Sequence, residues 1–303
     1  MSAELSTRKP LVVMAWVFLL LASLLPLVFL QEVLHLTVTE QLRYTISIVV
    51  LLAGLVLTFL WSAVRPLRPF FILFIVFAVV QGIVYTKVDK LPFYRTWSQH
   101  PSFNVWMPAE QSLHLIVMLV VIATLFILRK RASAFFLVKG DTNAPAEPVK
   151  LLGIKAGERW GSLGRLFSVI ISLGTLTFLV VSGTPRLDML VRVLPYLPVV
   201  LIAAASNALY EEVAWKASFL SVLEGTVGKQ QALWLMAAYF GIGHYYGVPY
   251  GIIGVVMAGF MGWLLGKSML ETRGLWWAWF IHFLQDVWIF LFLAIGSITP
   301  GGG

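Results

Sequence analysis

The chain consists largely of long apolar stretches, each close to twenty residues, separated by short charged segments. Twenty apolar residues in a helix rise about 30 Å, which matches the hydrocarbon thickness of a bilayer. In lipid the backbone must satisfy its own hydrogen bonds, so only helices and closed barrels can span it. The stretches lack the apolar–polar alternation of barrel strands. The sequence therefore predicts an all-α, polytopic transmembrane helical bundle.

Nine stretches are candidates for spans, but one short late segment can equally be half-inserted, so we expect eight to nine spans. The candidates are 11–30, 44–64, 69–86, 112–128, 166–182, 194–220, 231–246, 251–266 and 275–295. The first stretch is longer than the roughly 7 to 15 apolar residues of a signal peptide, which predicts a retained anchor.

Charge and composition agree with a membrane location. Charged residues make up 12% of the chain, about half of the roughly 25% found in soluble domains. The net charge of +8 would suit nucleic acid, but the basic residues lie between the predicted spans. An N-terminus inside the cell places most of them in the cytoplasm, as membrane topology requires. We therefore predict an integral protein of the cell membrane with no nucleic-acid partner.

Two long loops lie between the predicted spans. Residues 140–149 (GDTNAPAEPV) are polar and contain proline, which is typical of a linker. We predict an N-terminal four-span region at 1–140, a cytoplasmic linker at 141–165 and a C-terminal membrane region at 166–303. The loop 87–111 is rich in aromatic residues, which suits the headgroup level of a bilayer. A lid that faces a substrate is the alternative for this loop.

Ionisable residues lie inside the predicted spans of the C-terminal region, where each costs at least ~2.5 kcal/mol to insert. They are Glu211, Glu212, Lys216, His244, His282 and Asp286. Glu212 and Lys216 stand at i and i+4 with the acid first, the favourable order for a helical ion pair. A structural ion pair would explain these two residues alone. Two histidines with several carboxylates on three helices favour general acid–base chemistry. Packing contacts between membrane helices usually use Ser, Thr, Asn or Gln instead.

Three motifs at these positions resemble those of the CPBP family, the CAAX-endopeptidase and bacteriocin-processing (Abi) intramembrane proteases. The motifs read EEVAWK from position 211, FGIGH from 240 and HFLQD from 282. The family patterns are Glu-Glu-x-x-x-Arg, Phe-x-x-x-His and His-x-x-x-Asn/Asp, in this order on successive helices. The resemblance covers about 194–292. Lys216 replaces the family arginine, which keeps the charge but loses the two-pronged hydrogen bonding of a guanidinium.

The resemblance implies a glutamic-type intramembrane endopeptidase in which four residues carry the reaction. Glu211 and His244 would hold and deprotonate a water molecule. His282 would donate to the tetrahedral intermediate, and Asp286 would orient His282.

The remaining motif residues have supporting roles under the same resemblance. Glu212 with Lys216 would fix the rotation of the helix that carries Glu211, and Phe240 completes the second motif. The implied substrate is a membrane-embedded or lipid-anchored protein or peptide, cleaved near a terminus or membrane segment. Oligomeric state is not predicted.

Three alternatives stay open at this point. Glu211, His244 and His282 form a two-His, one-carboxylate set that could bind zinc, although no cofactor is our first expectation. The absence of His-Glu-x-x-His argues against a zincin-type metalloprotease. The buried charges could also form the proton or ion pathway of a transporter. A catalytically silent relative that binds a partner's membrane segment is the third alternative, because Lys216 departs from the family pattern.

Overall fold

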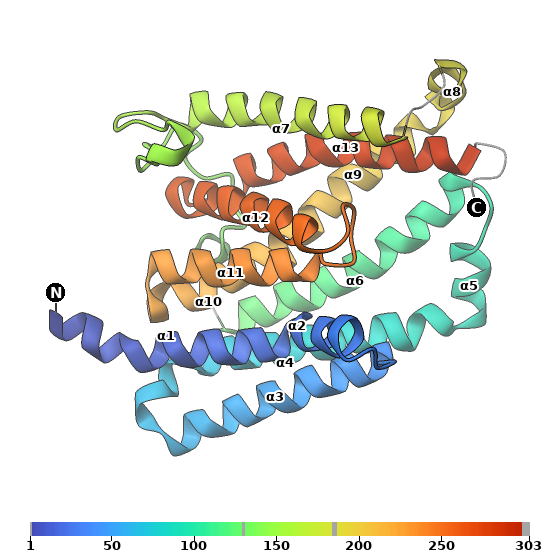
Figure 1. Cartoon of the computed structure of the whole chain (residues 1–303). Helices are drawn as coiled ribbons and strands as arrows, with labels where there is room; N and C mark the ends of the chain where they lie inside the picture. Colours follow the sequence, from blue (N-terminus) through green and yellow to red (C-terminus); the bar gives the residue numbers. More distant parts are fainter. Residues whose placement is uncertain (1, 129–130, 184–186, 299–303) are drawn as a thin grey trace.

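The computed structural model describes residues 2–128, 131–183 and 187–298 (Figure 1). In these residues the chain is built of helices, and pairing of extended backbone is limited to two isolated bridges. The all-α prediction is confirmed. The first half contains α1 (Ser2–Ala22), α2 (Leu25–Val28), α3 (Glu40–Leu60), α4 (Arg68–Thr86), α5 (Pro92–Ser98) and α6 (Phe103–Leu128). The second half contains α7 (Trp160–Gly183), α8 (Leu187–Arg192), α9 (Leu197–Glu211), α10 (Ser218–Val227), α11 (Lys229–Gly243), α12 (Ile252–Thr272) and α13 (Trp276–Ile298).

Short 3₁₀-helical and π-helical turns join these helices. The 3₁₀ turns are η2 (Ser62–Leu67), η3 (Val88–Lys90), η4 (Ala132–Phe135), η5 (Lys150–Leu152) and η6 (Leu194–Tyr196). Two π-helical turns, η1 (Phe29–Val33) and η7 (Glu212–Ala217), follow α2 and α9 directly.

Among the described residues, seven helices are long and apolar enough to cross a membrane. An eighth span is present if Lys9–Ala22 and Leu25–Val33, bent by 49°, cross together. This confirms a polytopic bundle and limits the predicted eight to nine spans to eight at most. The candidate 231–246 is α11, whose 15 residues rise about 22 Å, short of the ~30 Å hydrocarbon core. Apolar composition alone suggested a full span there.

Helices from both halves pack into one bundle. In Figure 1, α1, α3 and α4 lie on one side, α7 and α13 on the other, and α10, α11 and α12 between them. Aromatic rings join the layers: the ring centroid of Phe74 on α4 lies 3.9 Å from that of Phe219 on α10. Phe219 in turn lies 4.8 Å from Tyr239 on α11. One hydrophobic core therefore crosses the predicted boundary between the two membrane regions.

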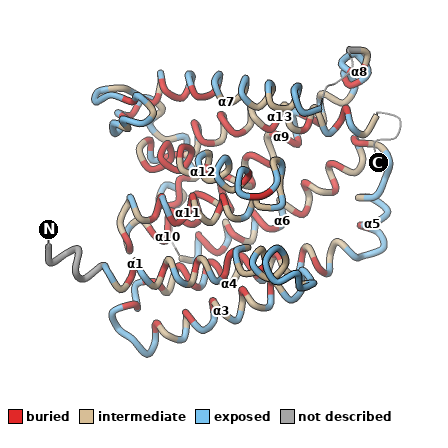
Figure 2. Tube along the Cα trace, viewed as in Figure 1, coloured by how far each residue is buried: buried red, intermediate tan, exposed pale blue. Residues whose placement is uncertain are grey.

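The outer helices present apolar side chains to the surroundings. Figure 2 shows the outward faces of α3 and α7 largely exposed. Phe59 on α3 is 66% exposed and Leu173 on α7 is 55% exposed. Soluble monomers rarely expose contiguous apolar surface on this scale, whereas helices in lipid do, because lipid tails are themselves apolar.

The predicted linker 141–165 is packed against the C-terminal helices. Trp277 Nε1 on α13 donates to the carbonyl oxygen of Thr142 at 2.8 Å. Trp160 Nε1 donates to Glu271 Oε2 at 2.7 Å. Because α7 begins at Trp160, the helix starts before the predicted end of the linker. The segment is therefore an ordered cap on the bundle.

The predicted loop 87–111 is partly helical, since α5 lies within it and α6 begins at Phe103. Its aromatic residues divide into two groups. Phe93 and Trp97 are exposed and can contact a headgroup layer, while Tyr94 and Phe103 are buried in the protein.

Candidate active site

The first motif lies where a long helix changes its winding. α9 ends at Glu211 and continues through the π turn η7 into α10. Inserted π turns are frequent at functional sites, because they re-aim side chains within an otherwise regular helix. In η7, Lys216 Nζ donates to Glu212 Oε1 at 2.7 Å, and neither side chain is exposed. The ion pair predicted from their spacing is confirmed.

This ion pair also contacts the other two motifs. Nδ1 of His282 on α13 lies 2.6 Å from the same Glu212 Oε1. Nζ of Lys216 lies 3.5 Å from the ring centroid of Phe240 on α11, a cation–π contact made stronger by burial. Glu212 thus holds the first motif to the third, and Lys216 holds it to the second.

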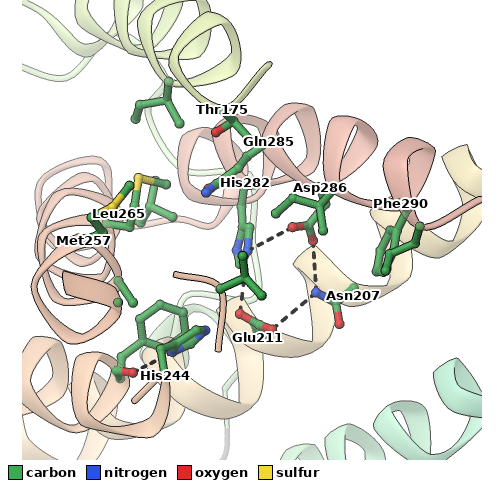
Figure 3. A pocket seen from close by; sticks show the side chains of 18 of the residues that line it. Thr175, Asn207, Glu211, His244, Met257, Leu265, His282, Gln285, Asp286 and Phe290 are labelled. Atoms are coloured by element: carbon green, nitrogen blue, oxygen red, sulfur yellow. Dashed lines mark hydrogen bonds and ion pairs between the residues drawn. The ribbon is translucent and has the colours of Figure 1, made fainter. Parts of the chain in front are cut away.

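A second set of contacts surrounds the other ring nitrogen of His282 (Figure 3). Nε2 lies 3.6 Å from Glu211 Oε2 and 3.5 Å from Asp286 Oδ1. Asn207 Nδ2 donates to both acids, at 3.3 Å to Glu211 Oε1 and 3.0 Å to Asp286 Oδ2. One amide from α9 therefore holds two carboxylates from two helices next to one imidazole.

His282 contacts a further carboxylate besides the one expected. The resemblance implies that Asp286 orients His282, and its carboxylate lies 3.5 Å from Nε2; the structure adds Glu212, which lies 2.6 Å from Nδ1. Contacts between helices decide this geometry, and the spacing of residues along one helix does not contain them.

His244 follows the end of α11. Its Nδ1 lies 2.8 Å from the carbonyl oxygen of Phe240, one helical turn earlier. A carbonyl only accepts hydrogen bonds, so Nδ1 carries the hydrogen and Nε2 of a neutral ring keeps its lone pair. The ring lines the same cavity as Glu211 and His282 (Figure 3).

These side chains meet in a cavity of about 600 Å³ between α6, α7, α9, α12 and α13. Its apolar lining includes Met107, Ile170, Ile171, Met257, Met261, Ile289, Phe290 and Leu293. The residues to which the resemblance assigns catalysis line this cavity, and the buried Glu212–Lys216 pair lies behind its wall. The cavity therefore has a polar centre within apolar walls.

Sequence reasoning missed several polar residues of the cavity wall, among them Asn207, Gln111 and His114. Asn207 stands four residues before Glu211, so a helical repeat already placed it on the same face. Gln111 and His114 come from α6, in the other half of the chain. No motif marked them, because only the folded bundle brings α6 beside α9 and α13.

The described residues contain no group of three or more His, Asp or Glu side chains placed to hold a metal ion. Of the suggested zinc ligands Glu211, His244 and His282, both histidines use Nδ1 for a contact within the protein. His282 Nδ1 contacts Glu212, and His244 Nδ1 contacts a backbone carbonyl. Histidines that bind zinc commonly make such contacts through their other ring nitrogen, so these contacts do not bear on the zinc alternative.

Fold and site together define an integral membrane protein with an ionisable cavity inside a helical bundle. Residues 193–288, about a third of the chain, match the family model described as type II CAAX prenyl endopeptidase Rce1-like. This segment is similar to that family, which confirms the resemblance drawn from the three motifs and supports a protease. Comparisons with curated proteins and with solved structures found no match.

Proposed function

We propose that this chain is an intramembrane endopeptidase of the glutamic type. It would cleave a membrane-embedded or lipid-anchored protein near a terminus or membrane segment. The observation that carries the proposal is the convergence of Glu211, His244, His282 and Asp286 on one cavity. We further propose 166–303 as the catalytic region, with the N-terminus in the cytoplasm.

Water activation is the role we assign to Glu211 and His244. The lone pair on Nε2 of His244 and the carboxylate of Glu211 are both able to accept a proton from water. The water oxygen then attacks the carbonyl carbon of the scissile bond, and the proton passes to the leaving amine. Positioned side chains of this kind contribute about 10²–10⁴-fold to hydrolysis.

Oxyanion stabilisation is the role we assign to His282. Its Nδ1 is held by Glu212, and its Nε2 is directed toward the cavity between Glu211 and Asp286. A protonated ring would donate from both nitrogens, and the surrounding carboxylates balance its charge. A donor fixed in this way needs little reorganisation when negative charge develops on the substrate oxygen.

Three variants test the assignment: Glu211→Gln, His244→Ala and His282→Ala. Each should lower cleavage at least about 100-fold while the protein remains folded in the membrane. Glu158→Gln and His100→Ala, which do not line the cavity, are the matched controls. Terminal-peptide profiling of membrane proteins would identify the substrates, and purified protein in liposomes would give the rates. Turnover near that of the unchanged chain in any of the three variants contradicts the proposal.

A further inference from the structure

Two helices outside the family-matched segment, α6 and α7, line the cavity. α6 contributes Trp106, Met107, Glu110, Gln111 and His114. Steps of four residues link positions 106, 110 and 114, and also 107 and 111, so these side chains share one broad face of the helix. The cavity is therefore lined in part by a helix that the three motifs do not include.

Two polar atoms on this wall have no partner among the described residues. They are Oε1 of Gln111 and Nδ1 of His114, both buried. Gln111 is only 6% exposed, and its Nε2 has just a weak contact to Met107 Sδ at 3.7 Å. The ring of His114 is fixed by flat stacking on Tyr210, with centroids 4.5 Å apart. A buried polar atom left unpaired is costly, and such atoms call for a ligand or a specific role.

A peptide in this cavity needs partners of the same kind. Cleavage requires an accessible bond, and an unwound segment exposes backbone N–H and C=O groups. Much of the remaining wall is apolar, so unpaired backbone groups would carry a desolvation penalty there. Side chains three apart on a helix are about 5–6 Å apart at Cβ, close to the roughly 6.6 Å between alternate residues of an extended strand. The spacing of the Gln111 and His114 side chains is therefore similar to the spacing of two backbone groups along one edge of an extended peptide.

We propose that Gln111 and His114 bind the backbone of an extended substrate segment next to the scissile bond. Gln111 Oε1 accepts a backbone N–H, and His114 Nδ1 pairs with a neighbouring backbone group. The proposal rests on the proposed peptidase function and adds a substrate-binding wall to it. It commits the substrate to an unwound, extended conformation in the cavity.

Binding is measured in the Glu211→Gln background, so that the result does not depend on turnover. The probe is a fluorescent prenylated CAAX-type peptide in liposomes, followed by anisotropy. Gln111→Leu removes the acceptor at similar volume, and His114→Phe keeps the stacking on Tyr210 but removes the ring nitrogens. Each should weaken the Kd about tenfold. An N-methyl group at the contacted amide of the probe should abolish the effect of Gln111→Leu.

Gln231→Leu is the matched control, because Gln231 accepts a hydrogen bond from Trp16 Nε1 at 3.0 Å and does not line the cavity. It should lower thermal stability and leave the Kd unchanged, whereas Gln111→Leu should leave stability equal or higher. An unchanged Kd in both α6 variants, or no binding of the probe, overturns the inference. Gln111-dependent binding without any cleavage by the unchanged chain supports the inference and contradicts the peptidase proposal.

Discussion

Glu212 Oε1 lies 2.6 Å from His282 Nδ1, and the same oxygen accepts from Lys216 Nζ at 2.7 Å. A single carboxylate oxygen therefore holds both a buried cation and the imidazole that we assign to oxyanion stabilisation. The contact combines two tasks, since it neutralises Lys216 and orients His282. Variants at these positions can separate the two.

Replacing Glu212 alone should reduce both stability and activity. Glu212→Leu leaves the Lys216 charge buried without a partner, which costs about 3–5 kcal/mol. Glu212→Leu with Lys216→Met removes both charges and should recover most of that stability. Activity should stay about 10²-fold or more below that of the unchanged chain, because His282 is no longer oriented. Recovery of activity together with the melting temperature would show that the pair is structural only.

Lys216→Arg should keep or raise activity. A guanidinium can stack on Phe240 and donate two hydrogen bonds to Glu212, as the family arginine would. Lys216→Ala removes the counter-charge of Glu212 and should lower the free energy of unfolding by several kcal/mol. Rates in liposomes and melting curves in detergent test both variants. If Lys216→Ala changes neither quantity, the pairing has no energetic role.

Asn207→Ala should lower kcat about tenfold or more with little change in KM. The two N–H bonds of its amide hold Glu211 and Asp286 in place, and supporting hydrogen bonds of this kind fix catalytic geometry. Asn207→Asp should be more harmful, because it adds a like charge beside two carboxylates. Asn104→Ala, at an exposed position of α6, is the control. A rise in KM at unchanged kcat would assign Asn207 to substrate binding instead.

An ion pair between the linker 141–165 and α11 should stabilise the fold slightly, and this contribution should be lost in acid. Lys229 Nζ donates to Glu147 Oε1 at 2.6 Å, and this hydrogen bond holds the pKa of Glu147 below its ordinary value of 4.5. The carboxylate therefore stabilises the fold above pH 4.5, and the contribution is lost as the pH falls through the lowered pKa. Glu147→Gln should lower the melting temperature slightly at neutral pH and not at strongly acidic pH. The effect is small because the pair is partly exposed. A difference that persists in strong acid contradicts this origin.

Single cysteines in this cysteine-free chain test the proposed orientation. Phe93→Cys and Leu151→Cys change residues that are 68% and 93% exposed. With the N-terminus in the cytoplasm, position 93 should react with an impermeant maleimide in intact cells. Position 151 should react only after permeabilisation, and the unchanged chain should not react at all. The opposite labelling pattern would place the N-terminus outside.

Much of the site could be predicted because its chemistry is costly in lipid. Charges at Glu211, His244, His282 and Asp286 stand out in apolar helices, and their order along the chain matched the family motifs. Asn207 was missed because an uncharged amide is an ordinary residue between membrane helices. Only its contacts to two acids distinguish it.

The sequence by itself determined the helical membrane bundle and the segment that resembles the protease family. Both follow from local properties, namely runs of apolar residues and short spacings within single helices. Only the tertiary structure decided that Glu212 contacts His282, that α11 is too short for a full span, and that α6 lines the cavity with Gln111. These features depend on the packing of helices that are far apart in the chain and on the π turn between α9 and α10. Apolar runs and spacings within single helices contain no information on such contacts.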